Sequence, residues 1–152
     1  MEFSMKEIFP LIEEGIKNGG KYRFYPKGVS MLPLLREGID SVMLSAVGEI
    51  KKYDMVLYRR DDGQFVLHRV VDVKDGKYNF CGDNQCYIEE GIRPDQIKAI
   101  VTAFYRGEEY IAIDNKEYVK YAKRRVASIP MRHKMLSLKG YLKRIKEILL
   151  KK

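Results

Sequence analysis

Ser30 lies in a segment whose composition favours a tight turn, Lys27-Gly28-Val29-Ser30-Met31-Leu32-Pro33. Gly28 permits a positive φ just ahead of the serine, and Pro33 restricts the residue before it to extended conformations. Such a turn exposes a hydroxyl and aims backbone N–H groups at one point, as an oxyanion hole requires. Most serines beside glycine and proline simply form turns, so this segment alone does not predict catalysis.

A nucleophilic serine needs a base, and His68 is the better placed of the two histidines. It lies in an apolar stretch, residues 65–71, which we expect to form a strand in which His68 and Arg69 face opposite sides. His133 lies instead in a basic segment. A lone histidine in an apolar strand is more often a hydrogen-bonded core residue than a catalyst. The pairing of His68 with Ser30 therefore depends on a fold that brings them together.

An orienting acid would complete this set by accepting the imidazole N–H and stabilising the imidazolium. Asp83 lies in Gly82-Asp83-Asn84, directly after an expected strand, and Glu89 and Glu90 follow shortly. By itself Gly82-Asp83-Asn84 is typical of an ordinary hairpin or Asx turn. The carboxylates are therefore candidates whose role depends on their order relative to the serine and the histidine.

Four segments together carry a family resemblance. In order and spacing they resemble the conserved boxes of type I signal peptidases, in particular the archaeal and endoplasmic-reticulum branch of the S24/S26 serine peptidase clan. The resemblance covers roughly residues 25–105. The segments are Gly28-Val29-Ser30-Met31-Leu32-Pro33, Tyr53-Asp54-Met55-Val56-Leu57-Tyr58, Leu67-His68-Arg69-Val70-Val71 and Gly82-Asp83-Asn84.

The resemblance implies Ser30 as nucleophile and His68 as general base. The base is a lysine in the bacterial signal peptidases and in the LexA-type self-cleaving repressors, so His68 makes this chain resemble the histidine branch. In the histidine branch the orienting aspartate is usually assigned six residues after the Gly-Asp-Asn aspartate, where this chain has Glu89. That departure leaves open whether Asp83, Glu89 or Glu90 orients the histidine. Asp83 is named first because its box is intact. No cofactor and no metal are expected.

The elements that must position these residues predict a mainly β fold class, with an N-terminal helix and a basic C-terminal helix. The resemblance further implies a signal-peptidase/LexA-like coiled β-strand core. A capping box at Ser4 and Glu7 predicts a helix over 5–18, which Pro10 should kink or delay. The β core is expected over 21–113, with hairpin tips at Asp62-Gly63 and Asp75-Gly76. The strand candidates are 42–44, 55–58, 65–73, 78–81, 97–105 and 110–113.

The formal net charge of +8 divides unevenly along the chain. Residues 1–115 carry 16 Lys and Arg against 19 Asp and Glu, whereas residues 116–152 carry 13 against 2. We therefore expect a mildly acidic peptidase domain over 1–115 and a basic, partly helical tail over 116–152. The charge of the whole chain would first suggest a nucleic-acid partner. Because the positive charge is confined to the tail, we expect that nucleic acid is not the partner.

The tail predicts a basic amphipathic helix over about 132–150, with apolar residues on one face and lysines and arginines largely on the other. Two interpretations stand side by side. The helix lies in the interface of an anionic membrane, or it packs on its own domain with a solvated basic face. Contact with nucleic acid ranks behind both.

The compartment expected from the sequence is the cytoplasm, with a peripheral position on the inner face of the membrane as the consequence of the first interpretation. No segment resembles a signal peptide or a spanning helix. Cys81 and Cys86 are expected as reduced thiols, too few for structural zinc.

The function expected is that of a serine endopeptidase that cleaves an extended peptide with small residues near the scissile bond, as the family resemblance implies. The alternative is a non-catalytic or self-cleaving LexA-like module whose basic tail binds membrane or nucleic acid. Self-cleavage is the weaker form of that alternative, because no helix-turn-helix segment is recognised ahead of the core.

Overall fold

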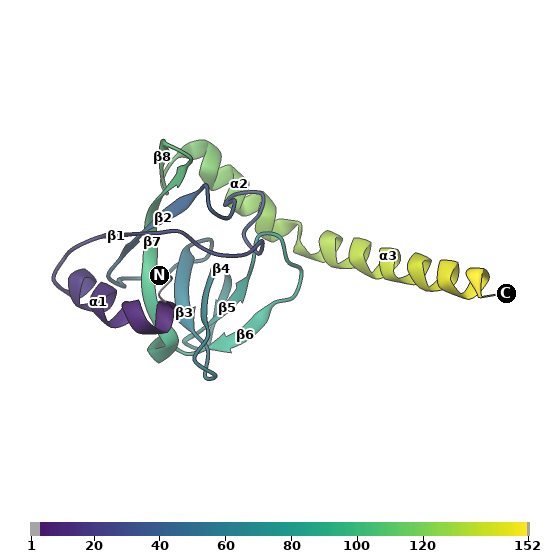
Figure 1. Cartoon of the computed structure of the whole chain (residues 1–152), viewed down its shortest axis with the longest axis horizontal. Coiled ribbons are helices and arrows are strands. Elements are labelled where there is room, and N and C mark those ends of the chain that lie inside the picture. Colours follow the sequence, from purple (N-terminus) through teal and green to yellow (C-terminus); the bar gives the residue numbers. More distant parts are fainter. Residues whose placement is uncertain (1–3, 152) are drawn as a thin grey trace.

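The computed structural model describes residues 4–151, which form one eight-stranded antiparallel sheet and three α-helices (Figure 1). In space the strands run β1-β2-β7-β3-β4-β5-β6, and β8 pairs with β7. The mainly β character expected from the sequence is confirmed. The strands are β1 (Tyr22–Phe24), β2 (Ser41–Ser45), β3 (Met55–Arg59), β4 (Phe65–Lys74), β5 (Lys77–Cys81), β6 (Glu89–Ile92), β7 (Ile97–Arg106) and β8 (Glu109–Ala112).

Helix α1 (Met5–Lys17) begins where the capping box predicts. The backbone N–H of Ser4 donates to Glu7 Oε2 at 2.8 Å, and its hydroxyl lies 3.0 Å from the same atom. Pro10 lies within the helix and is exposed. The expectation that it would delay the start is wrong, because the cap fixes the first turn at Ser4. The helix buries Phe9, Ile12 and Ile16 against the sheet.

Strands β3 and β4 divide the core into two clusters, because their side chains alternate between the two faces. Leu57 and Leu67 pack in a cluster that includes α1, whereas Tyr58, Val66 and their neighbours pack in another around Phe80. The β3–β4 and β4–β5 connections fall at Asp62-Gly63 and Asp75-Gly76, so both expected hairpins are confirmed.

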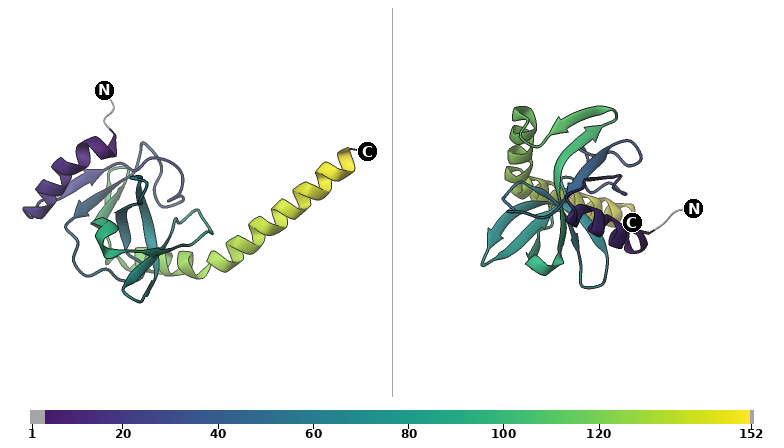
Figure 2. Two further views of the ribbon diagram at one scale, coloured as in Figure 1. Left: turned by 90° about the horizontal axis from the view of Figure 1, so that it is seen from below. Right: turned by 90° about the vertical axis from the view of Figure 1, so that its left-hand side faces the viewer.

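The basic segment after residue 115 forms two helices with different surroundings. Helix α2 (Lys116–Ala127) starts at Asn115, whose side chain accepts from the backbone N–H of Tyr118 at 3.0 Å, and it buries Tyr118 and Ala122. Helix α3 (Ile129–Leu150) projects from the body, away from α1 (Figures 1 and 2). Among its described residues only Ile129 is buried. Packing of this helix on its own domain, one of the two interpretations, is therefore not what the structure shows.

The length and apolar character of the helices also bear on membrane crossing. Within residues 4–151, none of the helices is both long enough and apolar enough to span a bilayer.

Candidate active site

Ser30 lies in the connection between β1 and β2, in the turn that its neighbours predict. Gly28 has a φ of +85°, which confirms the expected positive φ. Three apolar side chains of the same connection, Met31, Leu34 and Leu35, are buried in the cluster beneath α1. They anchor the turn and hold the half-buried Ser30 at the wall of a cavity.

The Gly82–Gln85 loop packs directly against this turn. The backbone N–H of Asn84 donates to the Ser30 carbonyl at 2.9 Å, and its side-chain amide donates to the Val29 carbonyl at 3.1 Å. A Cβ on Gly82 would lie 2.6 Å from the Ser30 carbonyl oxygen, so only glycine permits this approach. The Gly-Asp-Asn segment thus has a structural task, which is to brace the serine turn.

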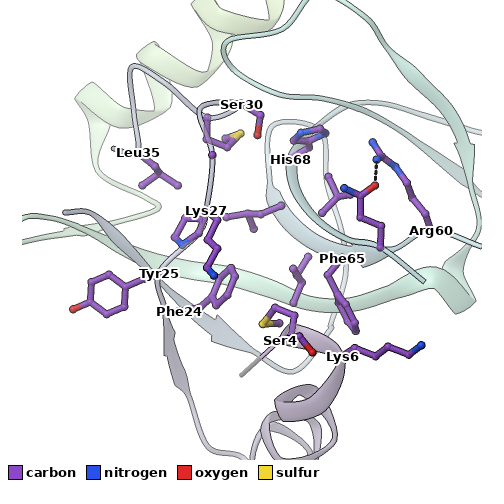
Figure 3. Close-up of a pocket in the computed structure, with 18 of the residues that line it drawn as sticks. Ser4, Lys6, Phe24, Tyr25, Lys27, Ser30, Leu35, Arg60, Phe65 and His68 are labelled. Carbon is purple, nitrogen blue, oxygen red and sulfur yellow. Dashed lines mark hydrogen bonds between the residues drawn. The ribbon is translucent and has the colours of Figure 1, made fainter. Parts of the chain in front are cut away.

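Ser30 and His68 line the same cavity, which has a volume of about 740 Å³. Figure 3 draws these two residues at one end of it, with Ser4, which caps α1, and Lys6 of α1 at the other. The remaining walls come from β1 and the segment after it, and from the β3–β4 hairpin. The apolar side chains that line it include Met5, Ile8, Phe24, Met31, Leu35, Leu57, Phe65, Val66 and Leu67.

His68 is buried on β4, with 5% of its surface exposed, and lies opposite Val56 of β3. Within residues 4–151, no hydrogen bond joins the Ser30 hydroxyl to its imidazole. Catalytic hydrogen bonds are often long without substrate and tighten in the Michaelis complex. The structure therefore brings the two residues into one cavity, without the direct hydrogen bond that proton transfer requires.

A tyrosine links His68 to a carboxylate. Tyr58 Oη lies 3.3 Å from His68 Nδ1 and 2.6 Å from Glu89 Oε1. Arg60 holds the other side of the same carboxylate, with its Nε 2.9 Å from Glu89 Oε2 and its Nη2 3.0 Å from Oε1. The Tyr58 ring stacks on Phe80 at 4.3 Å between centroids, which fixes the position of the hydroxyl.

The hydrogen bonds that link His68, Tyr58 and Glu89 define which nitrogen of the imidazole carries the proton. Tyr58 has one hydroxyl proton, and the 2.6 Å contact directs it to the Glu89 carboxylate. Its oxygen therefore accepts from His68, so Nδ1 carries the proton and Nε2 is left with a free lone pair. That is the tautomer a histidine base needs when its Nε2 takes the proton of a serine.

Asp83, the acid named first from the sequence, has different partners. Its two carboxylate oxygens accept from Arg69 Nε at 2.7 Å and Nη2 at 2.8 Å, and the Tyr121 hydroxyl donates to Oδ2 at 2.8 Å. The Asp83 and Arg69 side chains are each 1% exposed. The described residues therefore place Asp83 in a buried ion pair, without a hydrogen bond to His68. Glu90 is exposed, so Glu89 is the carboxylate connected to the imidazole.

The C-terminal helices close over the Asp83 loop. Arg125 Nε of α2 donates to the Asp83 carbonyl at 2.8 Å, and Arg132 Nη2 of α3 donates to the Gln85 carbonyl at 2.9 Å. The loop that braces Ser30 is thus itself held by the start of the basic segment.

Burial lowers the pKa of His68 to about 4, and the positive charge of Arg60 lowers it further, against the opposing effects of Glu89 and Asp83. The imidazole is therefore neutral at pH 7 and available to accept a proton. Burial raises the pKa of Glu89, but hydrogen bonds from Arg60 and Tyr58 outweigh burial and leave that pKa lowered. The pKa of Tyr58 is raised, mainly by burial and then by Glu89, so the tyrosine stays protonated.

The thiols and the other polar groups give no sign of a metal site. Cys81 and Cys86 are both free, and burial raises the pKa of Cys81 to about 11, so this thiol is protonated. Within residues 4–151, no group of three or more His, Cys, Asp or Glu side chains converges to hold an ion.

Three important residues received no role from the sequence: Tyr58, Arg60 and Arg69. Arg69 had a usable signal, because an arginine on the inner face of an apolar strand needs a carboxylate partner when buried. Tyr58 lies inside one of the four family-like segments, but its register against His68 depends on how β3 pairs with β4. Arg60 gave no such signal.

Comparisons of the chain with family models, with curated proteins and with solved structures found no match.

Proposed function

We propose that this chain is a serine endopeptidase of the signal-peptidase type, with Ser30 as nucleophile, His68 as general base and Glu89 acting on that base through Tyr58. The observation that carries the proposal is the shared cavity, in which Ser30 and a buried histidine of defined tautomer line one end. The family-like segments also support it, since two of them contain Ser30 and His68 and a third, Gly82-Asp83-Asn84, braces the Ser30 turn.

The reaction follows from these groups. Ser30 Oγ attacks the carbonyl carbon of a peptide bond while its proton passes to His68 Nε2, and an acyl-enzyme and a free amine result when the imidazolium returns that proton to the leaving nitrogen. Water then attacks the acyl group by the same route and releases the acid product. Backbone N–H groups of the turn beside Ser30 would stabilise the oxyanion.

Tyr58 and Glu89 compensate for the low basicity of a buried histidine. When His68 takes the serine proton, its positive charge forms in a site where burial and Arg60 oppose it. The Tyr58 hydroxyl keeps accepting from Nδ1, and the Glu89 carboxylate stabilises the imidazolium from the far side of the tyrosine. This arrangement assigns to Glu89, through Tyr58, the role that a direct aspartate has in a Ser-His-Asp triad.

The shape of the cavity favours an extended peptide as substrate. Strand β1 pairs only with β2 among the described strands, so it forms one edge of the sheet, and residues 22–28 line the cavity. An extended peptide bound along a strand edge gains main-chain hydrogen bonds and places alternate side chains in pockets. The apolar walls suit uncharged side chains near the cleaved bond.

The test is a cleavage assay on a mixed library of unstructured peptides, read by mass spectrometry so that no substrate need be known. We expect Ser30→Ala and His68→Ala each to lower cleavage by about 10⁴-fold or more, since nucleophile and base act as a unit. Ser137→Ala and His133→Ala are the matched controls, because both residues are exposed on α3.

Circular dichroism and thermal unfolding check that each variant is folded. Unchanged cleavage in a folded Ser30→Ala or His68→Ala variant would overturn the assignment, and so would an inactive unsubstituted chain that still binds the peptides.

A further inference from the structure

Helix α3 leaves the body almost as soon as it begins. Ile129 is buried and Arg132 still reaches the Gln85 carbonyl, but within residues 133–151 no hydrogen bond or ion pair reaches the body. Figures 1 and 2 show the helix as a straight arm with nothing packed along it. The arm is 22 residues long, which corresponds to about 33 Å.

One face of this arm is an apolar stripe. Its members recur at intervals of three, four and seven residues, so they share one side of the helix. Each is between 53% and 67% exposed: Met131, Met135, Leu138, Tyr141, Leu142, Ile148 and Leu149. A continuous exposed stripe of large apolar side chains marks a binding surface rather than a solvated face.

The rest of the arm is cationic. Seven lysines and arginines lie between residues 129 and 151, and Glu147 is the one acidic residue there. By helical spacing Lys139 and Lys146 border the stripe on one side, and Arg144 borders it on the other. Lys134 falls within the stripe, three residues after Met131, and Arg132 and Lys143 lie farther round the helix. Whatever covers the stripe must accept positive charge along its border.

We propose that α3 lies in the interface of an anionic lipid bilayer, with its apolar stripe among the acyl chains and its cations at the headgroups. A bilayer of this kind satisfies both halves of the helix at once. Paired copies of α3 would instead bring cationic borders together, whereas paired helices need opposite charges beside the seam. A nucleic acid would neutralise the cations but leave the stripe in water.

The arm's position leaves the proposed active site free. The cavity that contains Ser30 and His68 is lined by residues between 4 and 85, and none of its lining comes from α2 or α3. Contacts of Arg125 and Arg132 with the loop over 82–85 fix the root of the arm to the body. A membrane-bound arm would therefore hold the body at the surface with its cavity accessible.

The test is co-sedimentation of the full chain with vesicles of phosphatidylcholine alone or with 30% phosphatidylglycerol. The stripe variant is Leu142→Asp with Leu149→Asp. Its matched control is Leu136→Asp with Leu150→Asp, which makes the same chemical change on exposed leucines off the stripe. We expect tight binding only to anionic vesicles, a loss of more than tenfold in the stripe variant and a loss of less than about threefold in the control.

Equal losses in the two variants would overturn the proposal, as would equal binding to neutral and anionic vesicles. Sedimentation velocity without lipid tests the second copy: a dimer abolished by the stripe variant would contradict a lipid partner. Duplex DNA that binds the stripe variant and the unsubstituted chain equally, in the absence of vesicle binding, would do the same. The Ser30→Ala chain should bind vesicles normally, so failure of the proposed peptidase function is distinguishable from failure of this one.

Discussion

His68 and Arg69 are neighbours on β4, yet they face opposite sides of the sheet and have carboxylate partners of different kinds. Arg69 meets Asp83 directly, in an ion pair whose side chains are 1% exposed. His68 reaches Glu89 only through Tyr58, at the edge of a cavity, and Glu89 is clamped by a partly exposed Arg60. The Arg69–Asp83 pair is a closed site, whereas at the open site around His68 no hydrogen bond within residues 4–151 occupies Nε2.

The difference separates two roles that the sequence could not separate. A buried ion pair in which both carboxylate oxygens accept hydrogen bonds holds the loop that braces Ser30 and is not placed to take a proton from the serine. A histidine with one nitrogen held and the other free has the arrangement of a general base. The intact Gly-Asp-Asn segment is therefore important for structure, and the departure from the family pattern at Glu89 falls on the residue connected to His68.

The largest expected effect comes from breaking the closed site, the buried ion pair between Arg69 and Asp83. Asp83→Asn leaves Arg69 as a buried charge without its counterion, and we expect a loss of about 3–5 kcal/mol in the free energy of unfolding. Urea unfolding monitored by circular dichroism measures it. Asp61→Asn, which breaks the exposed ion pair with Arg93, is the control and should leave the free energy of unfolding nearly unchanged.

The same variant decides the role of Asp83. If Asp83→Asn retained its stability but lost cleavage, Asp83 and not Glu89 would be the acid that acts on His68.

The next largest effect comes from the open site, where Tyr58 links His68 to Glu89. Tyr58→Phe keeps the stacking on Phe80 but removes the partner of His68 Nδ1, so the productive tautomer is no longer favoured. We expect kcat/KM to fall by about 10–100-fold, in the range of general-base effects, with most of it in kcat. Tyr78→Phe, a partly buried tyrosine of the same cluster, is the matched control.

A positioning role also predicts an altered pH profile, which a purely structural role of Tyr58 would not give. Loss of activity through lower stability alone, with an unchanged profile, would contradict the assignment.

The smallest effect is a shift in pH dependence. Because the pKa of His68 is lowered to about 4, we expect the acid limb of kcat/KM near pH 4 and not near its ordinary value of 6.5. Glu89→Gln removes an influence that raises this pKa and should move the limb down, whereas Arg60→Gln removes one that lowers it and should move the limb up. Steady-state rates from pH 3.5 to 8 measure both shifts.

The sign of the linked stability follows from the same pKa. The unfolded chain binds a proton at His68 near pH 6.5 and the folded chain only near 4, so stability is complete above 6.5 and is lost as the pH falls toward 4. For the rate profile, shifts of the acid limb in the same direction in Glu89→Gln and Arg60→Gln would contradict the opposed effects of these two charges on the pKa of His68.

Much of the secondary structure was predictable, because it depends on local signals. The capping box placed α1, and the Asp-Gly pairs placed both hairpins. β1 and β6 were not predicted, since β1 has only three residues and β6, Glu89–Ile92, has two glutamates and a glycine in place of an apolar alternation. Helix α2 was also missed: its high charge hid Tyr118 and Ala122, which bury against the body.

By itself the sequence determined the residue types available for chemistry, the alternation that turns His68 and Arg69 apart, and the concentration of positive charge after residue 115. Only the tertiary structure decided which carboxylate serves which residue. Asp83 lies 14 positions from its arginine, and Glu89 lies 31 positions from the tyrosine that links it to His68. Hydrogen bonds form only within about 3 Å, and the pairing of β3, β4, β5 and β6 sets which groups approach so closely.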